Sequence, residues 1–245
     1  MTPTGGHRAG SIAASRNSRR SPPLPDTAVA TVAPPRPSLR GWSHLAMVPL
    51  ALAGAIILVI AGAGSIARQI SLAVYGLCLV LLFAVSASYH RGPWSPRTRR
   101  IWGRLDHATI FLAIAGTYTP VVVNVLKGWP SIVLLVVIWV LAGSGVIVAT
   151  TGIPLPRWVT VVLYLGVGWT VVFFLPALGD RIHTSGLLVL ALGGALYCAG
   201  AIVYALKRPR LWPKVFGFHE VFHILVIAAT AVYFVFILET VALQS

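Results

Sequence analysis

Residues 219–238 read HEVFHILVIAATAVYFVFIL, and this stretch governs how the rest of the chain is interpreted. The part after His223 carries no charged side chain, and the run is long enough to enter a hydrocarbon core as a helix. His219 and His223 would lie about one turn apart on the same face of that helix. Two imidazoles so placed can bind one metal ion. The plainer alternative is a pair of interfacial histidines bonded to backbone groups.

The composition of the whole chain is that of a membrane protein. Of the 245 residues, 57% are hydrophobic and only 10% are charged, whereas a soluble domain usually carries about a quarter charged residues. The net charge of +14 reflects nineteen Lys and Arg against five acids. We expect these bases to set the topology and to contact anionic phospholipid head groups, so the predicted partners are membrane lipids and not nucleic acid. Cys78 and Cys198 fall inside apolar runs and are expected to be core residues.

Seven apolar runs predict an all-α membrane protein, a seven-transmembrane helix bundle occupying residues 41–245. Each run has about 18–23 residues, enough to cross a hydrocarbon core as a helix. Residues 1–40 are rich in Ser, Pro, Arg and Ala, lack apolar periodicity, and are predicted to be a disordered basic N-terminal tail. The expected spans are Leu45–Ala63, Ile70–Tyr89, Ala108–Leu126, Ile132–Ala149, Trp158–Leu178, Thr184–Leu206 and Val221–Leu238.

The basic residues predict the orientation of these spans. Sixteen of the nineteen Lys and Arg fall in the tail and in the even-numbered loops, and only Arg68, Lys127 and Arg181 fall on the other side. The positive-inside rule therefore places the N-terminus in the cytosol and, with seven spans, the C-terminus outside. We expect a multi-pass protein of the plasma (inner) membrane.

Two further sequence features bear on helix shape and contact. Pro49, Pro120 and Pro176, within the first, third and fifth expected spans, should each kink or end a helix. Small residues recur in the apolar runs, as at Gly143 and Gly145, and should permit close approach of neighbouring helices.

Five titratable residues from three expected helices should meet at one depth of the membrane. His90 ends the second span, Asp106 and His107 precede the third, and His219 and His223 begin the seventh. All five fall at the predicted cytosolic ends, although they are far apart in the chain. Ionisable groups at membrane depth are candidates for function.

The residue types in this group predict a zinc site. Three protein ligands and one open position are typical of catalytic zinc, and His90, His219 and His223 are the predicted ligands. Asp106 could accept a hydrogen bond from a metal-bound water and act as general base. Ser86, one turn before His90, could bond to Asp106 or to the water; a bond to a carbonyl group of its own helix is the alternative.

Other polar residues near these positions are expected to play lesser roles. His107 should point about 100° away from Asp106 around the helix. His44, at the start of the first span, could join the pocket or cap the membrane interface, and we favour the interface. Glu220 should point away from the two histidines of its helix and could pair with an arginine of the cytosolic loops.

The stretch His219-Glu220-Val221-Phe222-His223 also matches the H-E-x-x-H pattern of metalloproteases. In that interpretation Glu220 is the general base and Asp106 becomes a ligand. The pattern is short, however, and it lies at the start of a final span near the surface. A third imidazole is already available at His90, so an intramembrane metalloprotease is the weaker hypothesis.

Three sequence blocks, in this order and at these helix ends, resemble the hemolysin III family of the progestin and adipoQ receptor superfamily. The resemblance covers about residues 38–240 and leaves out the tail. Its opening segment is Arg40-Gly-Trp-Ser-His44. The blocks are Ser86-Ala-Ser-Tyr-His90, Asp106-His107 followed by Gly116-Thr-Tyr-Thr-Pro120, and Phe218-His219-Glu220-Val-Phe-His223.

The resemblance implies a seven-helix fold with the N-terminus inside and zinc held by His90, His219 and His223 beside Asp106. Related alkaline ceramidases hydrolyse lipid amides, the wider superfamily includes receptors, and the bacterial branch is linked to lipid homeostasis and named for cytolysis. We therefore weigh a zinc-dependent hydrolase of lipid amides or esters against a non-enzymatic receptor or regulator with structural zinc. A pore-former is disfavoured because polar residues do not follow the full depth of the membrane.

Overall fold

The structure is a computed structural model that describes residues 37–243 except Arg210 and Pro213. Nearly all of the predicted N-terminal tail therefore lies outside the described residues. The described part is all-helical and contains no β-strand, as the sequence predicts. Its elements are α1 (Trp42–Ala61), α2 (Ile66–Arg91), α3 (Pro96–Asn124), α4 (Trp129–Thr151), α5 (Arg157–Gly168), the 3₁₀ segment η1 (Trp169–Phe174), α6 (Leu175–Gly179), α7 (Thr184–Leu206), α8 (Phe218–Ile237) and the π-helical turn η2 (Leu238–Ala242).

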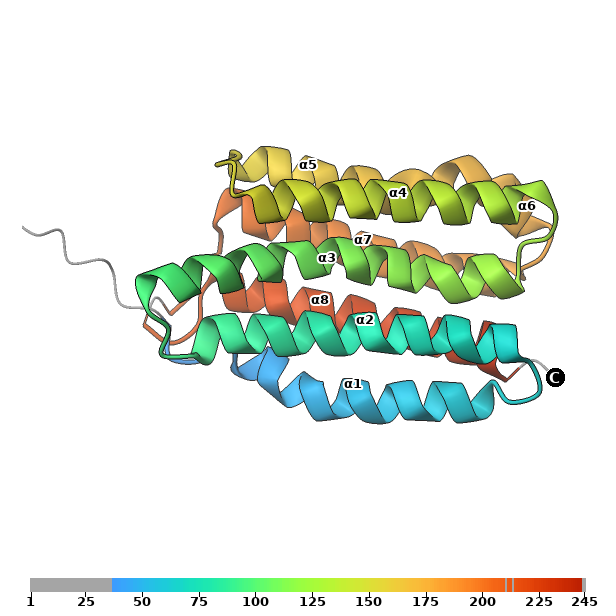
Figure 1. Cartoon of the computed structure of the whole chain (residues 1–245), viewed down its shortest axis with the longest axis horizontal. Helices are drawn as coiled ribbons and strands as arrows, with labels where there is room; N and C mark the ends of the chain where they lie inside the picture. Colours follow the sequence, from blue (N-terminus) through green and yellow to red (C-terminus); the bar gives the residue numbers. More distant parts are fainter. Residues whose placement is uncertain (1–36, 210, 213, 244–245) are drawn as a thin grey trace, which may run out of the picture. The chain divides into compact units, whose positions relative to one another are not determined.

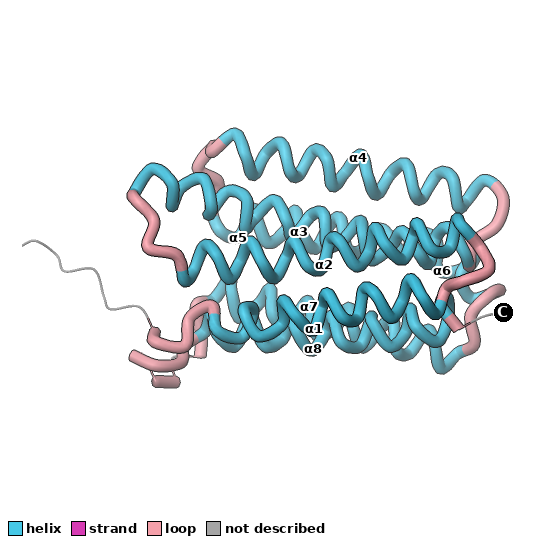
Figure 2. Tube along the Cα trace, turned by 60° about the horizontal axis from the view of Figure 1, so that its bottom comes forward, coloured by secondary structure: helices cyan, strands magenta, loops and turns pink. Residues whose placement is uncertain are grey.

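These elements form long rods that run side by side and alternate in direction (Figures 1 and 2). The start of α1, the α2–α3 and α4–α5 turns and the α7–α8 connection all lie at one end, on the left of Figure 1. We call this the histidine end, because His44, His90, His219 and His223 lie in helix turns there. The alternation brings segments distant in sequence to the same depth.

Six of the rods in the described part are long and apolar enough to cross a membrane: α1, α2, α4, α5 with η1 and α6, α7, and α8 with η2. The third expected span, Ala108–Leu126, lies in α3 except for its last two residues, and α3 is not among the six. The first half of α3 carries four arginines and the Asp106–His107 pair, so its apolar part is correspondingly short.

The helix α3 begins twelve residues before the expected span, at Pro96 instead of Ala108. The Ser95 side chain caps it by accepting the Thr98 backbone N–H, and proline is favoured in the first helical turn. Local capping thus extends the helix beyond its apolar run. The arginines expected in a loop are consequently displayed on helix turns at the histidine end.

The fifth rod is interrupted just before Pro176, close to the point where the sequence predicted a kink or a helix end. Between Gly168 and Leu175 the backbone tightens to 3₁₀ geometry, and Pro176 follows in the first turn of α6. A backbone change of this kind leaves peptide groups unpaired within a helix. The Tyr118 hydroxyl of α3 compensates, because it donates to the Gly168 carbonyl and accepts the Val171 N–H at 2.9 Å.

Glycines allow two helix pairs to approach closely. A Cβ atom added at Gly76 of α2 would lie 2.4 Å from the Ala55 Cβ of α1, and one at Gly145 of α4 would lie 2.4 Å from the Phe111 ring of α3. The expectation for Gly145 is therefore correct. The expectation for Gly143 is wrong, since a Cβ atom there would meet nothing within 4 Å.

Candidate metal centre

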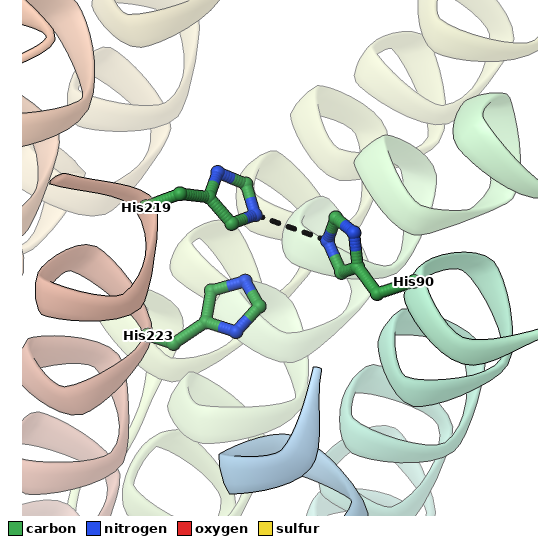
Figure 3. A group of neighbouring side chains, drawn as sticks. All are labelled: His90, His219 and His223. Carbon is green, nitrogen blue, oxygen red and sulfur yellow. Dashed lines mark hydrogen bonds between the residues drawn. The ribbon is translucent and has the colours of Figure 1, made fainter. Parts of the chain in front are cut away.

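Three imidazoles converge at the histidine end of the bundle (Figure 3). His90 lies in the last turn of α2, and His219 and His223 lie in the first two turns of α8. Their candidate ligand nitrogens all lie within 4.8 Å of one another, and the Nε2 atoms of His90 and His219 are 3.0 Å apart. All three are buried, with exposed fractions of 9%, 9% and 2%. The structure brings together the set that the sequence singled out.

The donor set fits a metal of the zinc type. Two ligands of a tetrahedral zinc ion at 2.0–2.1 Å lie about 3.4 Å apart, so small side-chain rotations would suffice. Nδ1 of His223 is buried and has no hydrogen-bond partner within the described residues. Burying several imidazoles is unfavourable unless their nitrogens are satisfied, and a bound cation would satisfy them.

Asp106 and Ser86 lie beside the three imidazoles. An Asp106 carboxylate oxygen is 3.9 Å from the His90 Nε2. Ser86 and Arg40 line the same cavity as the Asp106 carboxyl group. Ser86 is 2% exposed, so its hydroxyl is buried in α2. A place beside Asp106 is compatible with one of the two roles that the sequence left open for Ser86, and that role stays a prediction.

His107 lies outside the group of clustered imidazoles. Its side chain is exposed, and its backbone carbonyl accepts a hydrogen bond from the Tyr164 hydroxyl at 3.2 Å. This agrees with the expected orientation away from Asp106.

His44 belongs to the cluster, although of its two expected places we favoured the membrane interface over the pocket. It is 3% exposed, and its ring stacks on that of His223 with centroids 3.7 Å apart and planes 9° from parallel. Gly41, which precedes α1, explains how the start of α1 comes so close to His90 in α2. Its φ is +80°, and a Cβ atom at this position would lie 2.7 Å from the His90 Cβ. The sequence feature that could have indicated the burial of His44 is a glycine three residues before a histidine at the start of a helix.

Glu220 is committed to its own helix. Its Oε2 accepts the backbone N–H of Gly217 at 2.8 Å and thereby caps the start of α8. The expected pairing with an arginine is not found among the ion pairs of the described residues. A side chain held in this way is poorly placed to act as general base, which weakens the metalloprotease hypothesis.

A large cavity of about 860 Å³ adjoins the imidazoles. Its wall is mostly apolar and comes from α3, the α5–η1–α6 rod, α7 and α8. Charged side chains line one end, while Leu175 and Leu187 line the other. Along α7 the lining extends from Tyr204 to Leu187, about 25 Å at the rise of an α-helix. A long, mostly apolar space with charged groups at one end matches the shape of a lipid.

Comparison with known proteins places the chain in a family. Residues 33–234 match the model of the family described as Haemolysin-III related. Hemolysin-3 of Bacillus cereus is 30% identical over 187 residues, which is 76% of this chain and 82% of that protein. The Hemolysin-3 homolog of Bacillus subtilis (strain 168) is 30% identical over 179 residues, 73% of this chain and 81% of the homolog.

A relative from an animal extends the similarity. The human Monocyte to macrophage differentiation factor is 26% identical over 171 residues, 68% of each chain. The family match covers the described helices up to Phe234, including all four clustered histidines. The resemblance inferred from three short blocks is thus confirmed over most of the sequence, and the chain belongs to the hemolysin III family.

Proposed function

We propose that this protein is a membrane-embedded, zinc-dependent hydrolase that cleaves an amide or ester bond of a lipid. The single observation that carries the proposal is the meeting of three buried imidazoles and one carboxylate at the end of a lipid-shaped cavity. When bound, zinc activates a water molecule and polarises a carbonyl group.

The residues of the chain have separate roles in this proposal. His90, His219 and His223 would hold the ion. Asp106, 3.9 Å from the His90 ring, would take the proton of the attacking water and later return it to the leaving group. Ser86 would orient the Asp106 carboxylate. The apolar wall would hold the acyl chain so that the scissile carbonyl lies beside the carboxylate. Holding the reacting groups in this orientation would accelerate the reaction.

The topology that accompanies this function is part of the same proposal. We take all the rods, including α3, to cross the plasma membrane, with the N-terminus and the histidine end on the cytosolic side. Sixteen of nineteen Lys and Arg then face the cytosol, as the positive-inside rule requires. The lipids that reach the site would come from the cytosolic leaflet.

An Asp106→Asn variant tests the proposal. The purified, zinc-loaded protein is incubated with an N-acyl amide lipid and with a lysophospholipid, and released fatty acid is measured. The variant should bind about one zinc per chain, as wild type does, but release product at least about 100-fold more slowly, because general-base catalysis contributes 10²–10⁴-fold. His90→Ala is the matched control for loss of the metal. Zinc-dependent product formation that survives Asp106→Asn would contradict the mechanism.

A non-enzymatic receptor or regulator with structural zinc is the second candidate. Its supporting observation is that the three imidazoles are nearly inaccessible and join α2 to α8, so a bound ion would clamp two helices and stabilise the fold. In that case zinc would raise the melting temperature of wild type and of Asp106→Asn alike, and neither would release product from any lipid.

A further inference from the structure

We infer that the middle of the cavity contains a subsite for a hydroxyl group on the acyl chain of the ligand, with Tyr197 as the hydrogen-bond donor. This inference deepens the proposed function, because it names a substrate class: acyl lipids that are hydroxylated near the middle of the chain. It rests on the proposed function only for the identity of the bond that is cleaved. The subsite itself rests on the hydroxyl side chains that line the cavity far from its charged end.

Hydroxyl side chains from three helices border the middle of the cavity. Among them are Thr117 of α3, Tyr197 of α7 and Tyr233 of α8. At the rise of an α-helix, Thr117 lies about 16 Å along α3 from Asp106, and Tyr197 lies about 10 Å along α7 from Tyr204. The whole α7 lining is about 25 Å long. An acyl chain that fills the cavity would therefore place its middle carbons beside these hydroxyls.

The Tyr197 hydroxyl has a hydrogen-bond partner on α8 and still leaves one hydrogen unused. It pairs with the Thr230 hydroxyl, with the two oxygen atoms 3.1 Å apart. Each hydroxyl carries one hydrogen, and no other hydrogen bond of the pair is found within the described residues. Thr230 is buried, whereas Tyr197 lines the cavity. Both hydrogens are satisfied when Thr230 donates to Tyr197 and Tyr197 donates to a group inside the cavity.

Two oxygen atoms of the same wall can accept a hydrogen bond from the ligand. Tyr233 donates its hydroxyl hydrogen to the Leu190 carbonyl at 3.1 Å, and Thr117 donates its own to the Ala113 carbonyl at 2.8 Å, so the lone pairs of both hydroxyls remain available. The Tyr233 ring lies next to that of Tyr197, with centroids 5.8 Å apart. A ligand hydroxyl can accept from Tyr197 and donate to one of these oxygens, whereas a hydrocarbon chain can do neither.

The cavity also has room for a substituent at this level. A side cavity of about 50 Å³, lined by Thr117, Tyr118 and Tyr233 together with apolar residues, adjoins the large one. The Tyr233 ring is held at this place by α7, since a Cβ atom at Gly193 would lie 2.6 Å from the ring. An unsubstituted straight chain would leave the side cavity empty, and a group that projects from the middle of the chain would enter it.

A competition assay with uncharged ligands tests the subsite without turnover. Parinaric acid methyl ester, a fluorescent acyl ester, is bound to the full-length protein in a non-ionic detergent and displaced by methyl 12-hydroxystearate or by methyl stearate. Wild type should bind the hydroxylated ester roughly 3–10-fold more tightly, as expected for one additional neutral hydrogen bond. Tyr197→Phe should lose this preference and bind methyl stearate as wild type does. Equal binding of the two esters by wild type, the result expected if water alone fills the subsite, would overturn the inference.

The position of the hydroxyl on the acyl chain provides a second comparison. Methyl 17-hydroxystearate would place its hydroxyl near the apolar end of the cavity, beside Leu175 and Leu187, where it would lose its bonds to water without replacement. It should bind no more tightly than methyl stearate. A gain as large as that of the 12-hydroxy ester would mean that the position of the hydroxyl is not recognised, and this too would overturn the inference.

Tyr164→Phe is the matched control. Tyr164 also lines the cavity, but its hydroxyl donates to the His107 carbonyl at 3.2 Å, near the charged end. The variant removes the same atom as Tyr197→Phe does and should keep the wild-type preference. An equal loss of preference in Tyr164→Phe would contradict the assignment of the donor to Tyr197.

The melting temperature of each variant separates a binding role from a structural one. If Tyr197 only joins α7 to α8, Tyr197→Phe should melt at a lower temperature and still prefer the hydroxylated ester, which would overturn the inference. If Tyr197→Phe does not fold, Tyr233→Phe decides, because it removes a neighbouring acceptor and should reduce the preference; an unchanged preference would count against the subsite.

Hydrolysis measurements distinguish this inference from the proposed function. If unsubstituted acyl lipids are hydrolysed as fast as hydroxylated ones and the esters bind equally, this inference fails and the proposed function stands. If the hydroxylated ester is preferred but no lipid is hydrolysed, the reverse holds.

Discussion

His44 packs directly against one of the three predicted metal ligands. Its ring covers one face of His223 at 3.7 Å, and Phe83 contacts the His44 ring edge-on at 5.1 Å. The stack restricts rotation of the His223 ring and so fixes the direction of its nitrogens. Neighbours that orient metal ligands typically change metal affinity 10–100-fold when they are removed.

We therefore expect His44→Ala to weaken zinc binding by about 10-fold or more. The affinity is measured by competition with a chromogenic chelator. His183→Ala, which alters a histidine that precedes α7 at the opposite end of the bundle, should bind zinc like wild type. Unchanged affinity in a folded His44→Ala protein would show that the stack does not position His223.

Removing the hydroxyl group from each of two tyrosines in the helices should change stability in opposite directions. Tyr118→Phe should lower the free energy of unfolding by about 1–3 kcal/mol, because a buried carbonyl and N–H at the α5–η1 junction lose their partner. The Tyr75 hydroxyl is buried without a hydrogen-bond partner among the described residues, so Tyr75→Phe should be neutral or stabilising. Thermal unfolding in detergent measures both. The same sign for the two variants would contradict the assignment of these hydrogen bonds.

A glycine pair tests the contact between α1 and α2. Gly76→Ala should destabilise the protein by about 1–3 kcal/mol, since the new methyl group would press on Ala55 and overpacking of this kind is unfavourable. Gly143→Ala, where a methyl group meets nothing within 4 Å, should instead be stabilising by about 0.5–1 kcal/mol. The two variants carry the same chemical change. The difference between their melting temperatures therefore measures the effect of the close contact at Gly76.

The elements could be predicted from the sequence where one signal dominates. The bounds of α7 agree with the expected span at both ends, Thr184 and Leu206, because apolar length alone defines that helix. The start of α3 could not be predicted from the apolar run, since the cap at Ser95 determines it. The 3₁₀ segment before Pro176 was also missed, because it depends on the Tyr118 hydroxyl, 50 residues away from Gly168.

The candidate site could be predicted to a similar extent. His90, His219 and His223 were grouped because alternation of helix direction places their helix ends at one depth, and this needs no knowledge of packing. The burial of His44 could not be predicted in the same way. It depends on how closely α1 approaches α2 at Gly41, which is a property of side-chain contacts.

The predicted topology of the whole molecule depends on whether α3 crosses the membrane. Single cysteines are placed on either side of this helix, as Arg97→Cys and Lys127→Cys, in a chain whose Cys78 and Cys198 are replaced. Both chosen side chains are exposed. With seven spans and the N-terminus inside, a membrane-impermeant thiol reagent should label position 127 in intact cells and position 97 only after permeabilisation. Equal labelling of both positions would mean that α3 does not cross.

The charged groups that line the cavity within the described residues, Arg40, Asp106 and Arg157, lie at one end, and this position limits which lipids can reach the site. A lipid that enters from the opposite face would have to carry its charged group across the oily interior before reaching the histidines, which is strongly unfavourable. The protein would therefore draw on one leaflet only. In a cell, its turnover would then respond to whatever enzymes flip lipids between the two halves of the bilayer, and a change in transbilayer asymmetry would reach this protein as a change in substrate concentration.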